Sequence, residues 1–175
     1  MKTIVIYTSQ TGFTKRYAQW IAEAVKGECL ELSAVKKRSL EAYDAIVYGG
    51  WVCAGTIRKL DWFKNQVNGW TDKKLAVFCV GGSPIDSPDI EPFLKKVSDD
   101  MKREDVGVFY CPGGFCYEKM PMASRLMMKA FTKTLKSKKD KTEAEEAMVK
   151  MISSSYDISD EKYIRPIVEF LNTSY

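Results

Sequence analysis

The amino-acid sequence predicts an α/β fold: a doubly wound, five-stranded parallel sheet with helices on both faces. Two observations support this fold class. Strand-like apolar runs alternate with helix-like segments from the first residues onward, as in βαβ units. The chain also has the length of one ordinary domain and carries no internal repeat or Pro/Gly/Ser-rich linker, so we expect a single domain over residues 1–175. The expected strand order is 2-1-3-4-5, with a ligand at the switch point between the first and third strands.

Five short apolar segments are expected to form the strands. Thr3–Tyr7 is a continuous run rich in β-branched residues, as expected of a strand buried on both faces. The other four are Cys29–Leu32, Ala45–Tyr48, Leu75–Val80 and Val106–Tyr110. Paired glycines follow the third and fourth strands, and we interpret both pairs as the beginning of loops.

Helices are expected where apolar residues recur three and four positions apart and so share one face. The first covers residues 13–25, and the second includes a repeat at helical spacing from Ile57 to Val67. The third begins at Pro88, because proline is well tolerated at the first position of a helix. The last runs roughly from Glu161 to Leu171.

A long insert separates the fifth strand from the last helix, where a connection of roughly 2–6 residues would suffice. We expect it to be helical and to cover about residues 112–157. Two interpretations of its apolar side chains remain open. They could pack in the core, or they could lie with the nearby basic side chains on an anionic membrane, where flexible methionines adapt well. The apolar residues that share a face are Ala123, Leu126, Met127, Ala130, Phe131 and Leu135, beside Arg125, Lys129 and Lys133.

The composition excludes several classes of function. The chain has no histidine, which removes histidine-based metal sites and the usual acid/base shuttle near neutral pH, and we expect no metal. Its five cysteines lack metal-ligand or CxxC spacing and are expected to be free thiols in a reducing compartment. The N-terminal run is too short for a signal peptide, so we expect a cytoplasmic protein. The net charge of +4 suits anionic partners, but the scattered basic residues argue against nucleic acid.

The sharpest motif follows the first strand and opens the first helix, with the sequence Ser9-Gln10-Thr11-Gly12-Phe13-Thr14. Unpaired N–H groups at a helix start favour an anion, the hydroxyls add donors, and Gly12 lets the backbone approach closely. The loop contains no lysine and does not match the GxxxxGK[ST] pattern of a P-loop. It therefore predicts a site for a single phosphate monoester, with an ordinary capped turn as the alternative.

The pattern S-x-T-G-x-T after an N-terminal strand resembles the phosphate loop of flavodoxins. This resemblance implies a flavodoxin-like fold and non-covalent FMN, whose phosphate would be contacted by Ser9, Gln10, Thr11, Gly12, Phe13 and Thr14. Two further loops fall where that family holds the flavin ring. Trp51 either covers one face of the ring or packs within its loop. The expected ring-binding residues are Gly50, Trp51, Val52, Cys53, Ala54 and Gly55 after the third strand, and Gly81, Gly82 and Ser83 after the fourth.

Three further stretches are similar to the flavodoxin-domain branch that includes the quinone-dependent protoporphyrinogen IX dehydrogenases. They are Cys111–Phe115, the Met-rich stretch from Met120 to Met128, and Tyr156–Asp160. The resemblance implies a two-electron oxidation at FMN, with electrons passed to a quinone in the membrane. The chain departs from ordinary carrier flavodoxins in being basic and in lacking an acidic docking face.

Three functions stay open, and we favour the first. It is an oxidoreductase that passes electrons between a small substrate, such as a porphyrinogen, and a quinone or other acceptor. The second is a diffusible flavodoxin-type electron carrier, and the third is an interaction module that has lost FMN. The expected partners are a redox partner or small-molecule substrate and, through the Met/Lys-rich insert, the inner face of the membrane. No general base is identified, but Arg58 and Lys59 are candidate helpers for an anionic substrate.

Overall fold

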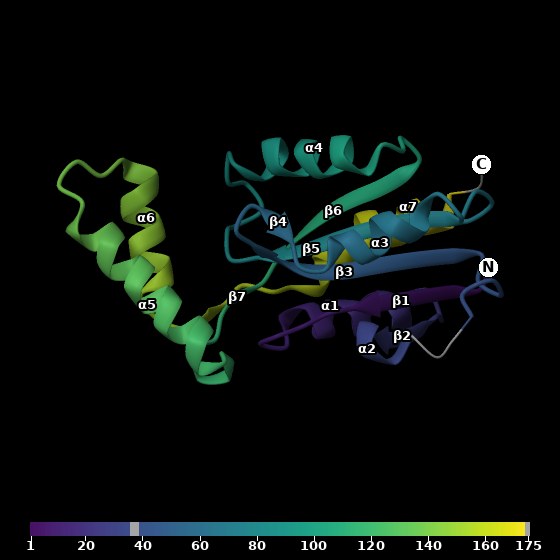
Figure 1. Ribbon diagram of the computed structural model, residues 1–175, viewed down its shortest axis with the longest axis horizontal. Coiled ribbons are helices and arrows are strands. Elements are labelled where there is room, and N and C mark those ends of the chain that lie inside the picture. Colours follow the sequence, from purple (N-terminus) through teal and green to yellow (C-terminus); the bar gives the residue numbers. More distant parts are fainter. Residues whose placement is uncertain (36–38, 174–175) are drawn as a thin grey trace.

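A parallel sheet forms the centre of the computed structural model, which describes residues 1–35 and 39–173 (Figure 1). The strand order is β2-β1-β3-β5-β6, and the short β4 pairs antiparallel with β3. Because β4 lies off this path and pairs only with the end of β3, the five parallel strands follow the predicted order 2-1-3-4-5. The strands are β1 (Thr3–Tyr7), β2 (Glu28–Glu31), β3 (Ala45–Cys53), β4 (Thr56–Ile57), β5 (Lys74–Gly81) and β6 (Val106–Pro112).

Helices cover both faces of this sheet, as expected for a doubly wound fold. Alternate residues of β1 point to opposite faces: Ile4 packs on the side that contains α3 and α4, and Val5 packs on the side that contains α1 and α7. Every residue of β1 is buried, which explains its largely apolar sequence. The helices are α1 (Phe13–Ala24), the short α2 (Leu32–Val35), α3 (Leu60–Val67), α4 (Ile90–Met101) and α7 (Arg165–Asn172), the last preceded by the 3₁₀ helix η2 (Glu161–Ile164).

The third strand differs from the prediction. It does not end at the glycines 49–50 but continues to Cys53, and a two-residue turn leads back into β4. Ala54 and Gly55 have φ angles of 50° and 74°, which suits a tight hairpin turn. The glycines are needed inside the strand for another reason, since a Cβ on Gly49 would lie 2.0 Å from the Phe78 ring.

Two helix starts were also predicted too early. Ile57 belongs to β4, so α3 begins only at Leu60. The helix that was predicted to begin at Pro88 is α4, and it begins at Ile90. In both places the residues before the helix continue its helical spacing but belong to another element. Ile57 is in β4, and the residues before Ile90 form a turn.

The insert before the last helix is helical, as predicted, and projects beyond the carboxyl ends of the strands (Figure 1). Its main elements, α5 and α6, pack against each other. At its base, β7 and β8 form an antiparallel pair that brings the two ends of the insert together. Its elements are β7 (Gly114–Phe115), η1 (Tyr117–Lys119), α5 (Met122–Ser137), α6 (Glu143–Ile152) and β8 (Tyr156–Asp157).

The apolar face of α5 is not part of a core, so the core-packing interpretation is wrong. Leu126, Met127 and Phe131 are exposed, and the most buried residue of the helix is Thr132. Helical spacing correctly predicted the face but not which side would be covered. Among the described residues, no helix combines the length and the apolar character that crossing a bilayer requires.

Candidate cofactor site

The predicted phosphate loop lies at the carboxyl edge of the sheet, beside β3. The N–H of Thr8 donates a hydrogen bond to the carbonyl of Gly49 at 2.9 Å, which ties the loop to the neighbouring strand. Because β1 pairs with β2 on one side and β3 on the other, the loop stands at the switch point where ligands of such sheets bind.

The loop turns at Gly12 and leaves the start of α1 open. Gly12 has a φ of 102°, which favours glycine, and no described atom beyond its chain neighbours lies within 4 Å of the position that a Cβ would take. Its N–H donates to the Ser9 hydroxyl at 3.2 Å, and its carbonyl accepts from the N–H of Arg16 at 3.0 Å. In the described part of the chain no side-chain oxygen caps α1. The positive end of this helix is therefore available to an anion.

The six motif residues are not equally accessible. Gln10 is exposed, whereas Ser9 and Thr11 are half-buried. The Phe13 side chain packs in the core beneath α1, and Thr14 is only 2% exposed. A ligand above the loop would therefore meet Phe13 through its backbone rather than its ring.

The first predicted ring-binding segment is the β3–β4 hairpin. Trp51, Val52 and Cys53 are half-buried strand residues, and Ala54 and Gly55 form the exposed turn. The side on which Gly50 would carry a Cβ is filled by the carbonyl of Arg58, 2.7 Å away. The need for glycine at position 50 is thus explained by packing within the hairpin.

Trp51 lies beside a cation in this hairpin. The Arg58 guanidinium carbon lies 6.0 Å from the centre of the Trp51 ring, and the Arg58 N–H donates to the Trp51 carbonyl at 2.9 Å. The Tyr48 hydroxyl donates to the Arg58 carbonyl at 2.6 Å, and burial raises the pKa of Tyr48, so the phenol stays protonated. The hairpin therefore presents an aromatic ring and a positive charge at the edge of the site.

Two tyrosines hold the second predicted ring-binding segment, Gly81–Ser83, in place. The Tyr156 hydroxyl donates to the Gly82 carbonyl at 2.7 Å, and the Tyr110 hydroxyl donates to the Ser83 carbonyl at 2.7 Å. Burial raises the pKa of Tyr156 to about 12 and also raises that of Tyr110. Both phenols remain donors across the neutral range.

The glycines of this segment again face the chain itself. A Cβ on Gly81 would lie 2.7 Å from the Tyr110 hydroxyl, and a Cβ on Gly82 would lie 2.4 Å from the Phe115 ring. The paired glycines after this strand were interpreted as the beginning of a loop beside the flavin ring. The space beside these glycines is filled by aromatic side chains from β6, β7 and β8. No local sequence pattern could reveal this packing.

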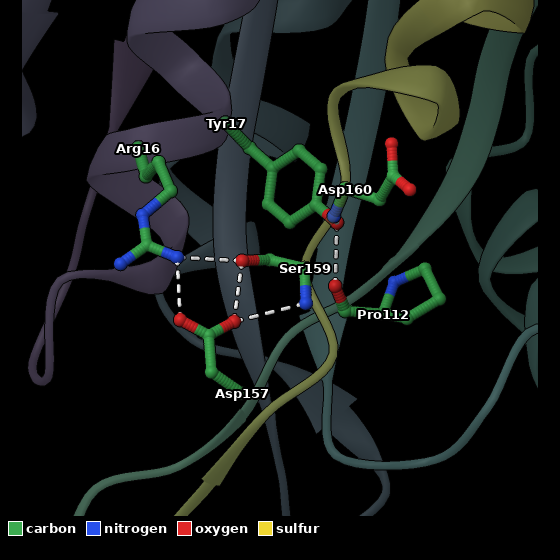
Figure 2. Close-up of polar contacts among 6 residues, drawn as sticks. All are labelled: Arg16, Tyr17, Pro112, Asp157, Ser159 and Asp160. Carbon is green, nitrogen blue, oxygen red and sulfur yellow. Dashed lines mark hydrogen bonds and ion pairs between the residues drawn. The ribbon is translucent and has the colours of Figure 1, made fainter.

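A polar cluster beside the phosphate loop was not predicted. Figure 2 shows the Arg16 guanidinium directed at Asp157 and Ser159, with distances of 2.6 Å to a carboxylate oxygen and 2.6 Å to the hydroxyl. The Tyr17 hydroxyl donates to the Pro112 carbonyl at 2.5 Å and accepts from the Asp160 N–H at 3.1 Å. The cluster holds the segment after β8 against the first turns of α1.

The charge of Asp157 is stabilised by this cluster. Partial desolvation opposes ionisation, but hydrogen bonds from Ser159 and Arg16 outweigh it and lower the pKa of Asp157 below its usual value. The sequence signal for this cluster is the stretch Tyr156–Asp160, which was identified only by its resemblance to the protoporphyrinogen dehydrogenase branch. Tyr156 holds the loop that begins at Gly81, and Asp157 pairs with Arg16.

The structure brings the three predicted segments to one edge of the sheet and adds the insert beside them. The Gln10 amide donates to the Ser124 hydroxyl at 3.1 Å, which links the phosphate loop to the first turn of α5. Cys53 pairs with Thr56 across the β3–β4 hairpin.

A protein-family model matches most of the chain. The family model described as "Flavodoxin domain" matches residues 4–142. No curated protein matches the chain. Similar solved structures include flavodoxin 2 from Bacillus cereus, with 18% identity over 64% of this chain and 86% of that one and a TM-score of 0.45. They also include the Trp repressor binding protein from Bacillus subtilis, with 16% identity over 65% and 88% and a TM-score of 0.46.

Proposed function

Because the chain belongs to the flavodoxin-domain family, we propose that it is a redox protein that binds FMN without a covalent bond. The observation that carries the proposal is the open start of α1 behind Gly12, at the switch point of the sheet. Hydroxyl groups of Ser9 and Thr11 flank this helix start. Neutral donors and a helix dipole suit a phosphate monoester without a metal ion.

The residues around this edge fit FMN in a divided arrangement. Ser9, Thr11, Thr14 and the backbone around Gly12 would hold the phosphate, while the β3–β4 hairpin and Gly81–Ser83 would hold the ring. When bound, the flavin supplies the redox chemistry, and the protein sets its orientation and access. Tyr110 and Tyr156 fix the second loop through its carbonyls. Arg58 holds a positive charge beside Trp51 at the rim.

We further propose that the protein is an oxidoreductase that passes electrons from a small substrate to a quinone or other acceptor, with a porphyrinogen as the first substrate to assay. Two observations support an anionic substrate: the net charge of +4 and the exposed Arg58 and Lys59 next to the hairpin. The free cysteines support a reducing, cytoplasmic location. Turnover of quinones separates this function from that of a diffusible electron carrier.

The first experiment is a fluorescence titration of FMN into the purified apoprotein, with riboflavin as the control. Because riboflavin lacks the phosphate, we expect FMN to bind at least tenfold more tightly, a difference of about 1.4 kcal/mol. Equal binding of the two would remove the phosphate assignment. Absence of binding by either would remove the redox proposal and leave the interaction module.

A variant tests the loop residues themselves. Thr11→Ala combined with Thr14→Val removes two hydroxyls, and valine preserves the volume of the buried Thr14. We expect FMN affinity to fall at least tenfold, or about 1.4 kcal/mol, while riboflavin affinity stays the same. The matched control is Thr134→Ala, which removes an exposed hydroxyl on α5.

A further inference from the structure

Helix α5 exposes its apolar face. Leu126 is 63% exposed, Met127 is 61% exposed and Phe131 is 46% exposed, and Met122 at the start of the helix is more open still. Scattered exposed apolar residues are ordinary, but these four lie on consecutive turns of one helix. Together with the exposed Ala123 and Ala130 they form a continuous apolar surface, which marks a site of interaction.

Although its apolar face is exposed, α5 is held in place by contacts on its other side. The opposite side contains the buried Thr132 and the half-buried Ser124 and Met128. The Ser124 hydroxyl accepts from Gln10 of the phosphate loop, and Lys138 just after the helix pairs with Glu145 of α6 at 2.7 Å. The helix is therefore held with its mixed side inward and its apolar side outward.

The charges around this face have one sign. Residues 119–139 contain six lysines and one arginine and no aspartate or glutamate. Lys129, Lys133 and Lys136 follow one another at intervals of four and three, so they form a row along one border of the apolar surface. All three are exposed. An apolar strip bordered by lysines is complementary to a surface that is apolar inside and anionic outside.

We propose that α5 binds an anionic lipid surface, lying in its plane with Leu126, Met127 and Phe131 among the acyl chains. The lysines would contact the lipid phosphates, since their long side chains reach the headgroup level while the helix lies below it. A second copy of the same face would set this lysine row close to another one, which disfavours self-association. The proposal does not depend on the bound cofactor.

The geometry gives this docking a consequence for the cofactor site. The Gln10–Ser124 hydrogen bond joins the phosphate loop to the first turn of α5, so the two lie next to each other. Docking of α5 would therefore bring the carboxyl edge of the sheet close to the lipid surface. An acceptor dissolved in the bilayer would then be within reach of that edge.

The test is co-sedimentation of the full chain with vesicles of phosphatidylcholine alone or with phosphatidylglycerol. We expect binding only to the anionic vesicles. The affinity for them should fall at least tenfold between low and high salt. Leu126→Gln with Met127→Gln should lower binding at least tenfold. The matched control, Ile85→Gln with Met148→Gln, replaces two exposed apolar residues elsewhere and should leave binding unchanged.

A second pair of variants tests the charges. Lys129→Gln, Lys133→Gln and Lys136→Gln together should abolish the preference for anionic vesicles. Removal of three lysines from α4 and its end, at positions 95, 96 and 102, should preserve most of it. Equal losses in the two triple variants would overturn the proposal, because net charge alone would then explain binding.

Two other results would also overturn it. If the wild-type chain ignores anionic vesicles but forms a dimer in sedimentation velocity that Leu126→Gln with Met127→Gln disrupts, the face binds a second copy. If vesicle binding is absent and the chain stays monomeric, the face does not bind lipid. FMN affinity is measured in the same variants, and it should be unchanged, so failure of this proposal is distinguishable from failure of the cofactor proposal.

Discussion

Helices α1 and α5 have the same kind of sequence pattern and opposite surroundings. In α1 the apolar face, with Tyr17, Ala18 and Ile21, is completely buried against the sheet. In α5 an equally periodic face, with Leu126 and Met127, is exposed, and the buried residue is a threonine. Periodicity therefore predicts that a helix has an apolar side, but the partner of that side lies elsewhere in the chain or outside it.

The difference separates two roles within one molecule. The sheet and its helices form a core whose packing determines the cofactor edge. The insert is attached to that edge by the β7–β8 pair, Tyr156 and the Gln10–Ser124 bond, and it offers its apolar face outward. The variants below test this division, from the largest expected effect to the smallest.

The largest contrast is between two phenylalanines. Phe78 on β5 is fully buried and fills the space beside Gly49, whereas Phe131 on α5 is half-exposed. We expect Phe78→Ala to lower the free energy of unfolding by about 3–5 kcal/mol. Phe131→Ala should cost only about 1 kcal/mol, because about half of that side chain stays in water in the folded protein. Urea unfolding of both variants measures the difference, and similar costs would show that the α5 face is covered in solution.

A smaller effect is expected where the insert joins the core. Tyr156→Phe keeps the ring but leaves the half-buried Gly82 carbonyl without its hydroxyl donor, and should lower the free energy of unfolding by about 1 kcal/mol. Tyr117→Phe is the control, because its hydroxyl bonds Ile152 within the insert. Hydrogen exchange should quicken near Gly82 only in the first variant. Faster exchange there in both would mean that the insert and the loop open together.

The smallest effect concerns the pair between Arg16 and Asp157. This contact is partly exposed, so Asp157→Asn should cost less than about 1 kcal/mol. Because folding lowers the pKa of Asp157, its stabilisation is present above the ordinary aspartate value of about 3.9 and disappears as the pH falls through the lower folded value. The gap between wild type and variant should therefore be full at pH 6 and close toward pH 2.

Urea unfolding at several pH values measures this gap. Asp99→Asn, which breaks a more exposed pair within α4, is the control and should cost less still. A gap that persists unchanged at pH 2 would mean that the asparagine disturbs packing rather than the charge.

Much of the core fold could be predicted because its signals are local. The all-buried β1 requires an apolar run, and alternation of such runs with helices predicts a parallel sheet. The motif from Ser9 to Thr14 predicts an anion site from short-range geometry alone, because Gly12 precedes an uncapped helix start. The assignment of FMN to that site stays a prediction.

The details of the site depended on distant residues. Nothing near Gly50 in the sequence indicates that the strand continues into a hairpin, because glycine is as compatible with a close contact as with a loop. Tyr110 and Tyr156 are 27 and 74 positions from the carbonyls that they hold, and Asp157 is 141 positions from Arg16. Contacts of this range leave no spacing pattern in a single sequence.

The sequence by itself determined the succession of strands and helices along the chain, the loop that opens α1 and the presence of an amphipathic helix in the insert. Each follows from interactions among neighbouring residues: strand and helix periodicity, and the exposed N–H groups of a helix start. Only the tertiary structure decided that aromatic side chains fill the space beside Gly49, Gly81 and Gly82 and that α5 turns its apolar face to solvent. Burial depends on what the rest of the chain places against a surface, and periodicity carries no information about that partner.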